Sequence, residues 1–220
     1  MRPLFQAAAV AALVAAGGQA QSALITFDDL VTGATSYAYD GDADGIPDAV
    51  FSTTDPAGFN TVGPGPNQNY IREPGLEGTS LLNPDLRIDF VFGATGSLGF
   101  GFALNSVVAD AAYFASMSVY DEFDNLLGSD TVAGIFTPTP SGLSSFPEGL
   151  VGVSFAGRAA YALLNFESQF GRYIIDDFSG TFGSTEVPEP WSIALVLAGL
   201  AAAGAARRRS ADTRDRVAAA

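Results

Sequence analysis

Residues 86–104 read LRIDFVFGATGSLGFGFAL, and this stretch decides the fold class. Apolar side chains alternate with polar residues or glycine in two runs, Leu86, Ile88, Phe90 and Phe92, then Leu98, Phe100, Phe102 and Leu104. A period of two places each run on one face of a β-strand. The stretch therefore predicts two neighbouring strands, each with one face in a core.

The same alternation recurs along the rest of the chain. Further strands are predicted at residues 25–27, 114–120, 126–132, 151–155, 161–166 and 173–178. Segments rich in Pro, Gly, Asp and Asn separate them, as turns require. Short strands at this spacing predict an all-β fold over residues 24–186, a two-sheet antiparallel β-sandwich of the jelly-roll type. Residues 40–80 have few alternating apolar positions, so we expect a long loop excursion there.

The chain is strongly acidic, with 24 Asp and Glu residues, 10 basic residues and a net charge of −14. Between residues 22 and 190 there are 22 acids and only four arginines, and the chain has no lysine. Such a surface excludes nucleic acid as a partner, because phosphate binding needs clustered basic side chains. Two uses of the acids stay open: they bind divalent cations such as Ca²⁺, or they keep the domain soluble.

The absence of both cysteine and histidine excludes several kinds of chemistry. Without them the chain can form no disulfide, no Ser-His-Asp or Cys-His nucleophile and no histidine-ligated zinc site. A pair of carboxylates could still hydrolyse a glycosidic bond, but no motif singles one out. We therefore expect a protein that is not an enzyme.

The first 23 residues have the layout of a secretory signal peptide. Arg2 is followed by an apolar run at residues 7–16 and then by small residues up to Ala23. Cleavage is expected after Ala20 or after Ala23. The chain is thus predicted to use the secretion machinery and to be exported.

The last quarter of the chain predicts a membrane-associated tail. Val187-Pro188-Glu189-Pro190 precedes an uncharged apolar segment at residues 191–206, which is near the length needed to cross a bilayer. Arg207-Arg208-Arg209 follows and is expected to stay on the cytoplasmic side, with residues 210–220 as a cytoplasmic tail.

Residues 187–209 resemble the PEP-CTERM sorting signal of Gram-negative bacteria that secrete exopolysaccharide. The tripeptide, the spacing, the apolar helix and the arginine cluster all agree, whereas residues 210–220 extend beyond the usual end of such tails. The resemblance implies an exosortase as a partner and cleavage near residues 188–190. It also implies a location in the cell envelope, on the outer surface or in the extracellular matrix.

A first acidic cluster is Asp40, Asp42, Asp44 and Asp48, with Gly45 among them. Alternating aspartates in a turning loop can converge on one Ca²⁺, and the sequence of this loop resembles the calcium loops of thrombospondin type 3 repeats. It is not a full EF-hand loop, because Phe51 stands where a bidentate Glu is expected. The alternatives are a calcium site and a solvated acidic loop.

A second cluster is expected where the first and last strands lie side by side, as they do in jelly rolls. It would join the pair Asp28 and Asp29 to the pair Asp176 and Asp177. Four carboxylates without a basic partner repel one another, and a bound cation relieves this. The pattern is similar to jelly-roll carbohydrate-binding modules with a structural Ca²⁺. The alternative is that some of these acids point into solvent.

Taken together, the sequence predicts a non-enzymatic envelope or matrix protein associated with exopolysaccharide or biofilm. Two alternatives stay open, a carboxylate-based glycoside hydrolase and a calcium-dependent carbohydrate-binding module. Aromatic residues in predicted loops are candidates for stacking on sugar rings, and their alternative is ordinary packing. These residues are Tyr37, Tyr39, Phe59, Tyr70 and Phe146.

Overall fold

The computed structural model describes residues 21–63, 67–72 and 74–182. Most of the predicted signal peptide, the sorting signal at 187–209, the apolar segment at 191–206 and the tail at 210–220 lie outside these residues. Across the described part of the chain, no helix is long and apolar enough to span a membrane.

The described residues form an all-β domain in which every strand pairing is antiparallel. This confirms the predicted fold class. The strands are β1 (Gln21–Ile25), β2 (Ser36–Tyr39), β3 (Ala49–Ser52), β4 (Asn60–Val62), β5 (Gly75–Thr79), β6 (Leu86–Leu104), β7 (Phe114–Tyr120), β8 (Leu126–Ala133), β9 (Pro138–Thr139), β10 (Gly142–Leu143), β11 (Glu148–Phe166) and β12 (Arg172–Phe182).

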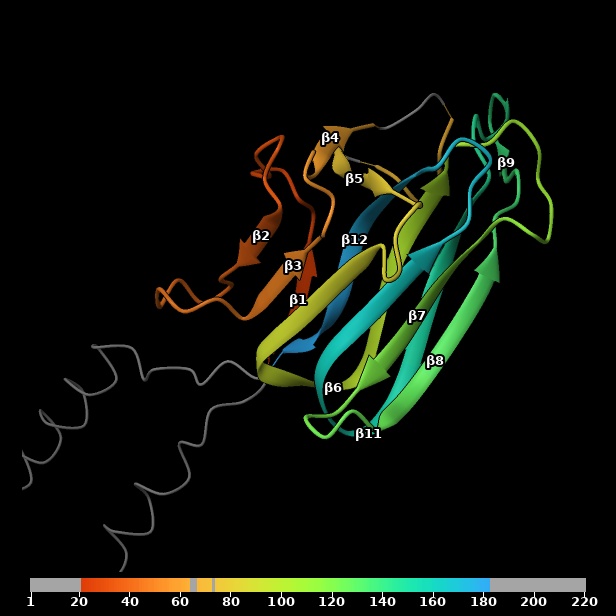
Figure 1. The fold of residues 1–220 in the computed structure, drawn as a ribbon. Helices are drawn as coiled ribbons and strands as arrows, with labels where there is room; N and C mark the ends of the chain where they lie inside the picture. The colour runs from red at the N-terminus through yellow and green to blue at the C-terminus, as the bar shows by residue number, and fades with distance from the viewer. Residues whose placement is uncertain (1–20, 64–66, 73, 183–220) are drawn as a thin grey trace, which may run out of the picture. The chain divides into compact units, whose positions relative to one another are not determined.

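Two strands of 19 residues each, β6 and β11, organise the fold. They pair with each other along most of their length, and both bend back sharply in the middle (Figure 1). The bends contain Gly93, Gly96 and Gly157, whose φ angles of +76°, +79° and +94° suit glycine. Residues 86–104 are thus one bent strand, and the prediction of two separate strands is wrong at this point.

The bends fold one continuous sheet into two layers. The first layer runs β2-β3-β6-β11-β7-β8 and uses residues 86–90 of β6. The second runs β4-β5-β12-β6-β11 and uses residues 94–104 of β6, with β1 added to β12. The first and last of these strands therefore lie side by side, as the sequence predicted, with Ile25 opposite Phe178.

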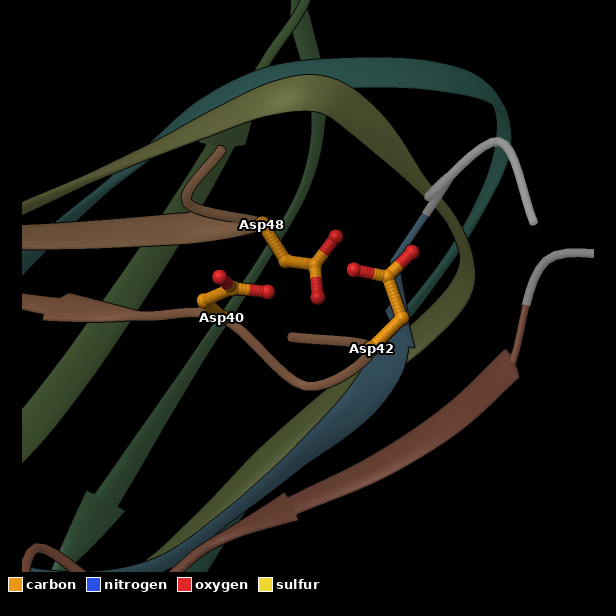
Figure 2. Close-up of side chains that lie close together, drawn as sticks. All are labelled: Asp40, Asp42 and Asp48. Carbon is orange, nitrogen blue, oxygen red and sulfur yellow. The ribbon is translucent and has the colours of Figure 1, made fainter. Parts of the chain in front are cut away.

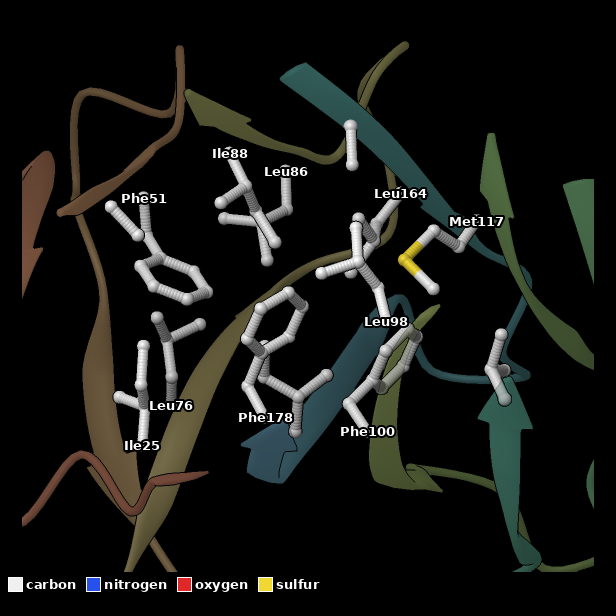
Figure 3. Packing of buried hydrophobic residues seen from close by; sticks show 14 of the residues in the cluster. Ile25, Phe51, Leu76, Leu86, Ile88, Leu98, Phe100, Met117, Leu164 and Phe178 are labelled. Atoms are coloured by element: carbon white, nitrogen blue, oxygen red, sulfur yellow. The ribbon is translucent and has the colours of Figure 1, made fainter. Parts of the chain in front are cut away.

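The core lies between the two layers and is rich in phenylalanine (Figure 3). Phe51 from the first layer meets Phe178 from the second edge to face at 5.2 Å between ring centroids. Phe100 and Phe166 make a similar contact at 6.0 Å across the layers. Most of the phenylalanines predicted to fill a sandwich interior do so, although Phe92 at the end of its run is only half-buried.

Residues 40–80 are not the single loop excursion that the sequence predicted. They contain β3, β4 and β5, and residues 69–72, which lie between β4 and β5, are held by buried acids. Glu148, which is fully buried, accepts hydrogen bonds from the backbone N–H groups of Asn69 and Tyr70 and from the Thr137 hydroxyl. Asp176, also fully buried, accepts one from Arg72 N at 2.8 Å. Buried carboxylates thus fix this segment by satisfying its N–H groups.

Candidate metal centre

The first acidic cluster lies in the loop between β2 and β3, next to the start of β3. The loop turns on itself through aspartate side chains that accept bonds from its own backbone. Asp40 Oδ2 accepts the Gly45 N–H at 2.8 Å, and Gly45 takes a φ of +88° that favours glycine. The Asp and Gly residues of the sequence motif therefore build the turn itself.

Three of the four predicted ligands converge in this loop (Figure 2). Carboxylate oxygens of Asp40, Asp42 and Asp48 lie within 4.8 Å of one another, and this is the one group of three or more acids so placed among residues 21–63, 67–72 and 74–182. The geometry suits a hard cation, which takes oxygen ligands from several carboxylates.

Asp48 is the most buried member, with 5% of its surface exposed. Its Oδ2 accepts the Gly41 N–H at 2.9 Å, whereas its Oδ1 is buried and has no hydrogen-bond partner. Asp42 Oδ2 is also buried and has no hydrogen-bond partner. Figure 2 shows the carboxylates of Asp42 and Asp48 facing each other. A cation between these two buried acceptors would satisfy both of them.

The electrostatics of the loop agree with this geometry. Burial is the main cause that raises the pKa of Asp48 above its ordinary value of 3.8, and the nearby Asp42, Asp40 and Asp44 raise it further. The Gly41 N–H opposes this rise. The pKa of Tyr39 is also raised, by burial and then by Asp48 and Asp40. A cation or a proton would relieve the excess negative charge.

Asp44, the fourth predicted ligand, is not in the converging group. Its Oδ1 accepts the Ile46 N–H at 2.7 Å, and its own N–H donates to Asp40 Oδ1 and Asp42 Oδ1. Asp44 therefore supports the turn that holds the other carboxylates.

The second predicted cluster does not assemble, although its strands are neighbours. The chain turns away after β1, with Phe27 at a φ of +62°, and β5 occupies the edge of β12 beside Ile175. Asp28 accepts the Thr26 hydroxyl at 2.7 Å and Asp29 accepts the Tyr37 hydroxyl at 2.7 Å. Both acids face solvent, which was the alternative left open.

The two acids of that cluster that lie in the last strand, Asp176 and Asp177, have a structural role. Asp176 is buried and accepts the Arg72 N–H and, at 2.8 Å, the Asp177 N–H. Asp177 is half-buried, has a φ of +50° and lies in a β-bulge that follows Asp176. These contacts fix the neighbouring loop, and no group of three converging acids forms there among the described residues.

The aromatic residues singled out from the sequence are mostly packed. Phe59 is 1% exposed, and Tyr37 packs against Phe27 and Phe51. Tyr39, Tyr70 and Phe146 are half-buried.

Two surface features were missed by the sequence reasoning. One is a stack on the outer face of the first layer, where Arg87 lies 4.0 Å from the Tyr161 ring and Tyr161 stacks on Tyr120 at 5.0 Å. The other is Phe123, which is 75% exposed between β7 and β8. The alternation within each strand could have placed the stack on an outer face, but only strand register brings its members together.

Comparison with known proteins assigns no family. No protein-family profile matches the chain, and no curated protein matches it. Among solved structures, the K2 cleaved adhesin domain of Lys-gingipain is 15% identical with a TM-score of 0.38, over 74% of this chain and 98% of that one. The MgGH51 α-L-arabinofuranosidase is 10% identical with a TM-score of 0.39, over 75% of this chain and 27% of that one.

The carbohydrate-binding module CBM29-2 gives a third similarity, at 12% identity and a TM-score of 0.30, over 76% of this chain and 88% of that one. With TM-scores below 0.5, these three similarities assign no function to the chain.

Proposed function

We propose that this protein is an exported, non-enzymatic β-sandwich that binds Ca²⁺ through Asp40, Asp42 and Asp48. The observation that carries the metal proposal is the buried Asp48 carboxylate, whose Oδ1 has no hydrogen-bond partner and lies among other carboxylates. Three carboxylates supply only part of the six to eight oxygens that Ca²⁺ takes, so backbone oxygens or water complete the set. We expect the affinity of an extracellular module, about 10⁻⁴ to 10⁻³ M.

The bound ion would have a structural role. It would offset part of the negative charge of the loop between β2 and β3 and fix the start of β3, where Asp48 O accepts the Val91 N–H of β6 at 3.1 Å. The Asp42 and Asp48 side chains share a small pocket with Ser22, Ala23 and Leu24 of β1 and Phe182 of β12. Occupation of the site would thus stabilise the packing of this loop against β1 and β12, the first and last strands of the domain.

Isothermal titration of the purified protein with CaCl₂, together with metal analysis, tests this proposal. We expect one ion per chain and a lower melting temperature after chelation with EDTA. Protein that contains no Ca²⁺, shows no heat of binding and melts at the same temperature with EDTA would refute the metal site.

We further propose that the protein is sorted to the envelope, outer surface or extracellular matrix of a Gram-negative bacterium, in association with exopolysaccharide. The sequence of residues 187–209 supports an exosortase as the partner. Cleavage after Ala23 would remove Gln21, Ser22 and Ala23, which pair with β12, so cleavage after Ala20 suits the fold better. The pairing of β1 with β12 supports the description of this sandwich as a jelly roll.

Intact-mass analysis of the protein from its host tests the processing. We expect a mature chain that begins at Gln21 and has lost Arg207, Arg208 and Arg209. A mass that retains these arginines would refute sorting by cleavage. A screen with polysaccharide substrates tests the enzymatic alternative, because released sugars would show a carboxylate-based glycoside hydrolase.

A further inference from the structure

A cleft of about 520 Å³ lies at the end of the domain where β6 and β11 bend. The turn between β7 and β8 forms one wall, and the bends of β6 and β11 form the other. Its charged lining comes from Asp121, Glu122 and Arg158, and its aromatic lining comes from Phe90 and Phe123. This volume falls within the range of about 300–1,000 Å³ that ligand pockets occupy.

Phe123 is presented by a rigid turn. Asp121 Oδ1 accepts the N–H groups of Phe123 and Asn125, each at 2.9 Å, and Asp121 Oδ2 accepts the Asn125 side-chain amide. Asp124, at a φ of +63°, is anchored to the sheet because its Oδ1 accepts the Tyr161 hydroxyl at 2.7 Å. The backbone that carries Phe123 is therefore held at several points, which reduces the ordering that a ligand must impose on the turn, and the ring itself is 75% exposed.

Arg158 supplies hydrogen-bond donors on the opposite wall. Its guanidinium donates to Phe92 O, and its side chain lies across Gly93, where a Cβ would collide with it. Arg87 and Arg172 are held in salt bridges with Asp89 and Glu77, whereas Arg158 is exposed and forms no salt bridge within the described residues. Glycine at position 93 thus lets a charged donor lie over the bend.

We propose that this cleft binds a segment of a neutral hexose polysaccharide. An exposed phenyl ring can pack against the apolar face of a pyranose, while Arg158 donates to its hydroxyl groups and Glu122 accepts from them. Two acids and one arginine give the lining a net negative charge, which disfavours a polymer of uronic acids. The inference rests on the proposed association with exopolysaccharide and gives that association a binding surface, and none of these side chains belongs to the metal centre.

Titration with neutral hexose oligosaccharides, and with a polyuronate for comparison, tests the cleft. Phe123→Ala should weaken binding by about tenfold or more, the loss that corresponds to about 1.4 kcal/mol. Phe170→Ala is the matched control, because Phe170 is also exposed, at 55%, and does not line the cleft. It should bind like the unchanged protein.

Three results would overturn the proposal: no binding of any neutral oligosaccharide, equal weakening by Phe170→Ala, or preference for the polyuronate. The melting temperature with and without Ca²⁺ separates this test from that of the metal centre. Phe123→Ala should keep the Ca²⁺ effect on melting. A protein that binds sugar but shows no Ca²⁺ effect would refute the metal site and leave the cleft standing.

Discussion

Replacement of Asp48 by asparagine removes the charge from the most buried member of the candidate metal centre. Without Ca²⁺, Asp48→Asn should raise the melting temperature, because burial and three neighbouring aspartates raise the pKa of Asp48 and so penalise its charged form. With Ca²⁺, the same variant should lose the stabilisation by the ion, because it loses a charged ligand. One substitution thus has opposite effects in the two conditions.

The size of the Ca²⁺ effect follows from mass action. For a dissociation constant of about 10⁻⁴ M, typical of a site with few charged ligands, about 10 mM Ca²⁺ is a hundredfold excess and stabilises by about 2.7 kcal/mol. A domain of this length gains about 2–4 °C in melting temperature per kcal/mol. The unchanged protein should therefore melt about 5–10 °C higher with Ca²⁺, and Asp48→Asn should shift by less than about 2 °C.

Differential scanning calorimetry in EDTA and in CaCl₂ measures both effects. Asp44→Asn is the control, because Asp44 carries the same charge in the same loop but lies outside the converging group. It should keep most of the Ca²⁺ shift. The reasoning would be refuted if Asp48→Asn kept the full shift, or if it melted below the unchanged protein in EDTA.

Three further predictions concern the buried acids and the core. Glu148→Ala should lower the free energy of unfolding, measured by urea denaturation, by about 3–5 kcal/mol, because the Asn69 N–H, the Tyr70 N–H and the Thr137 hydroxyl lose their buried acceptor. A loss below about 1 kcal/mol would contradict the role of Glu148 in holding these groups. Phe178→Ala should lower the free energy of unfolding by about 3–5 kcal/mol in the same assay, because the fully buried ring contacts Phe51 across the core and Phe100 within its own layer. In EDTA, the stability advantage of Asp48→Asn over the unchanged protein should shrink as the pH falls through the raised pKa of Asp48, and it should vanish below the ordinary value of 3.8. The reason is that the Asp48 carboxylate of the folded protein takes up a proton in this range and loses its charge. An advantage that stays constant with pH would rule out the charge of Asp48 as its cause.

The alternation of apolar residues was enough to predict the fold class but not the shape of its longest strands. Leu86, Ile88 and Phe90 face the core as expected, because period two is a local property of the chain. Gly93 and Gly96 lie between the two runs that were predicted as separate strands, whereas in the structure they let one strand bend and continue. A local sequence pattern cannot distinguish one bent strand from two separate strands, because this depends on whether the partner strand continues to pair beyond the bend.

The candidate metal centre was predicted in part for a similar reason. Asp40, Asp42 and Asp48 lie close in sequence, so their spacing carried most of the information. Spacing does not tell which aspartate caps its own turn, and Asp44, predicted as a fourth ligand, lies outside the converging group and accepts the Ile46 N–H instead. The second cluster depended on where a long-range strand pairing ends, and β5 takes the place beside β12 that the prediction gave to the residues after β1.

The antiparallel pairing of β1 with β12 determines how the domain would respond to a mechanical pull. Gln21 lies opposite Phe182, so tension applied at these two positions acts across the end of the ladder. The hydrogen bonds would then open one pair after another, as in a zipper, instead of resisting together in shear.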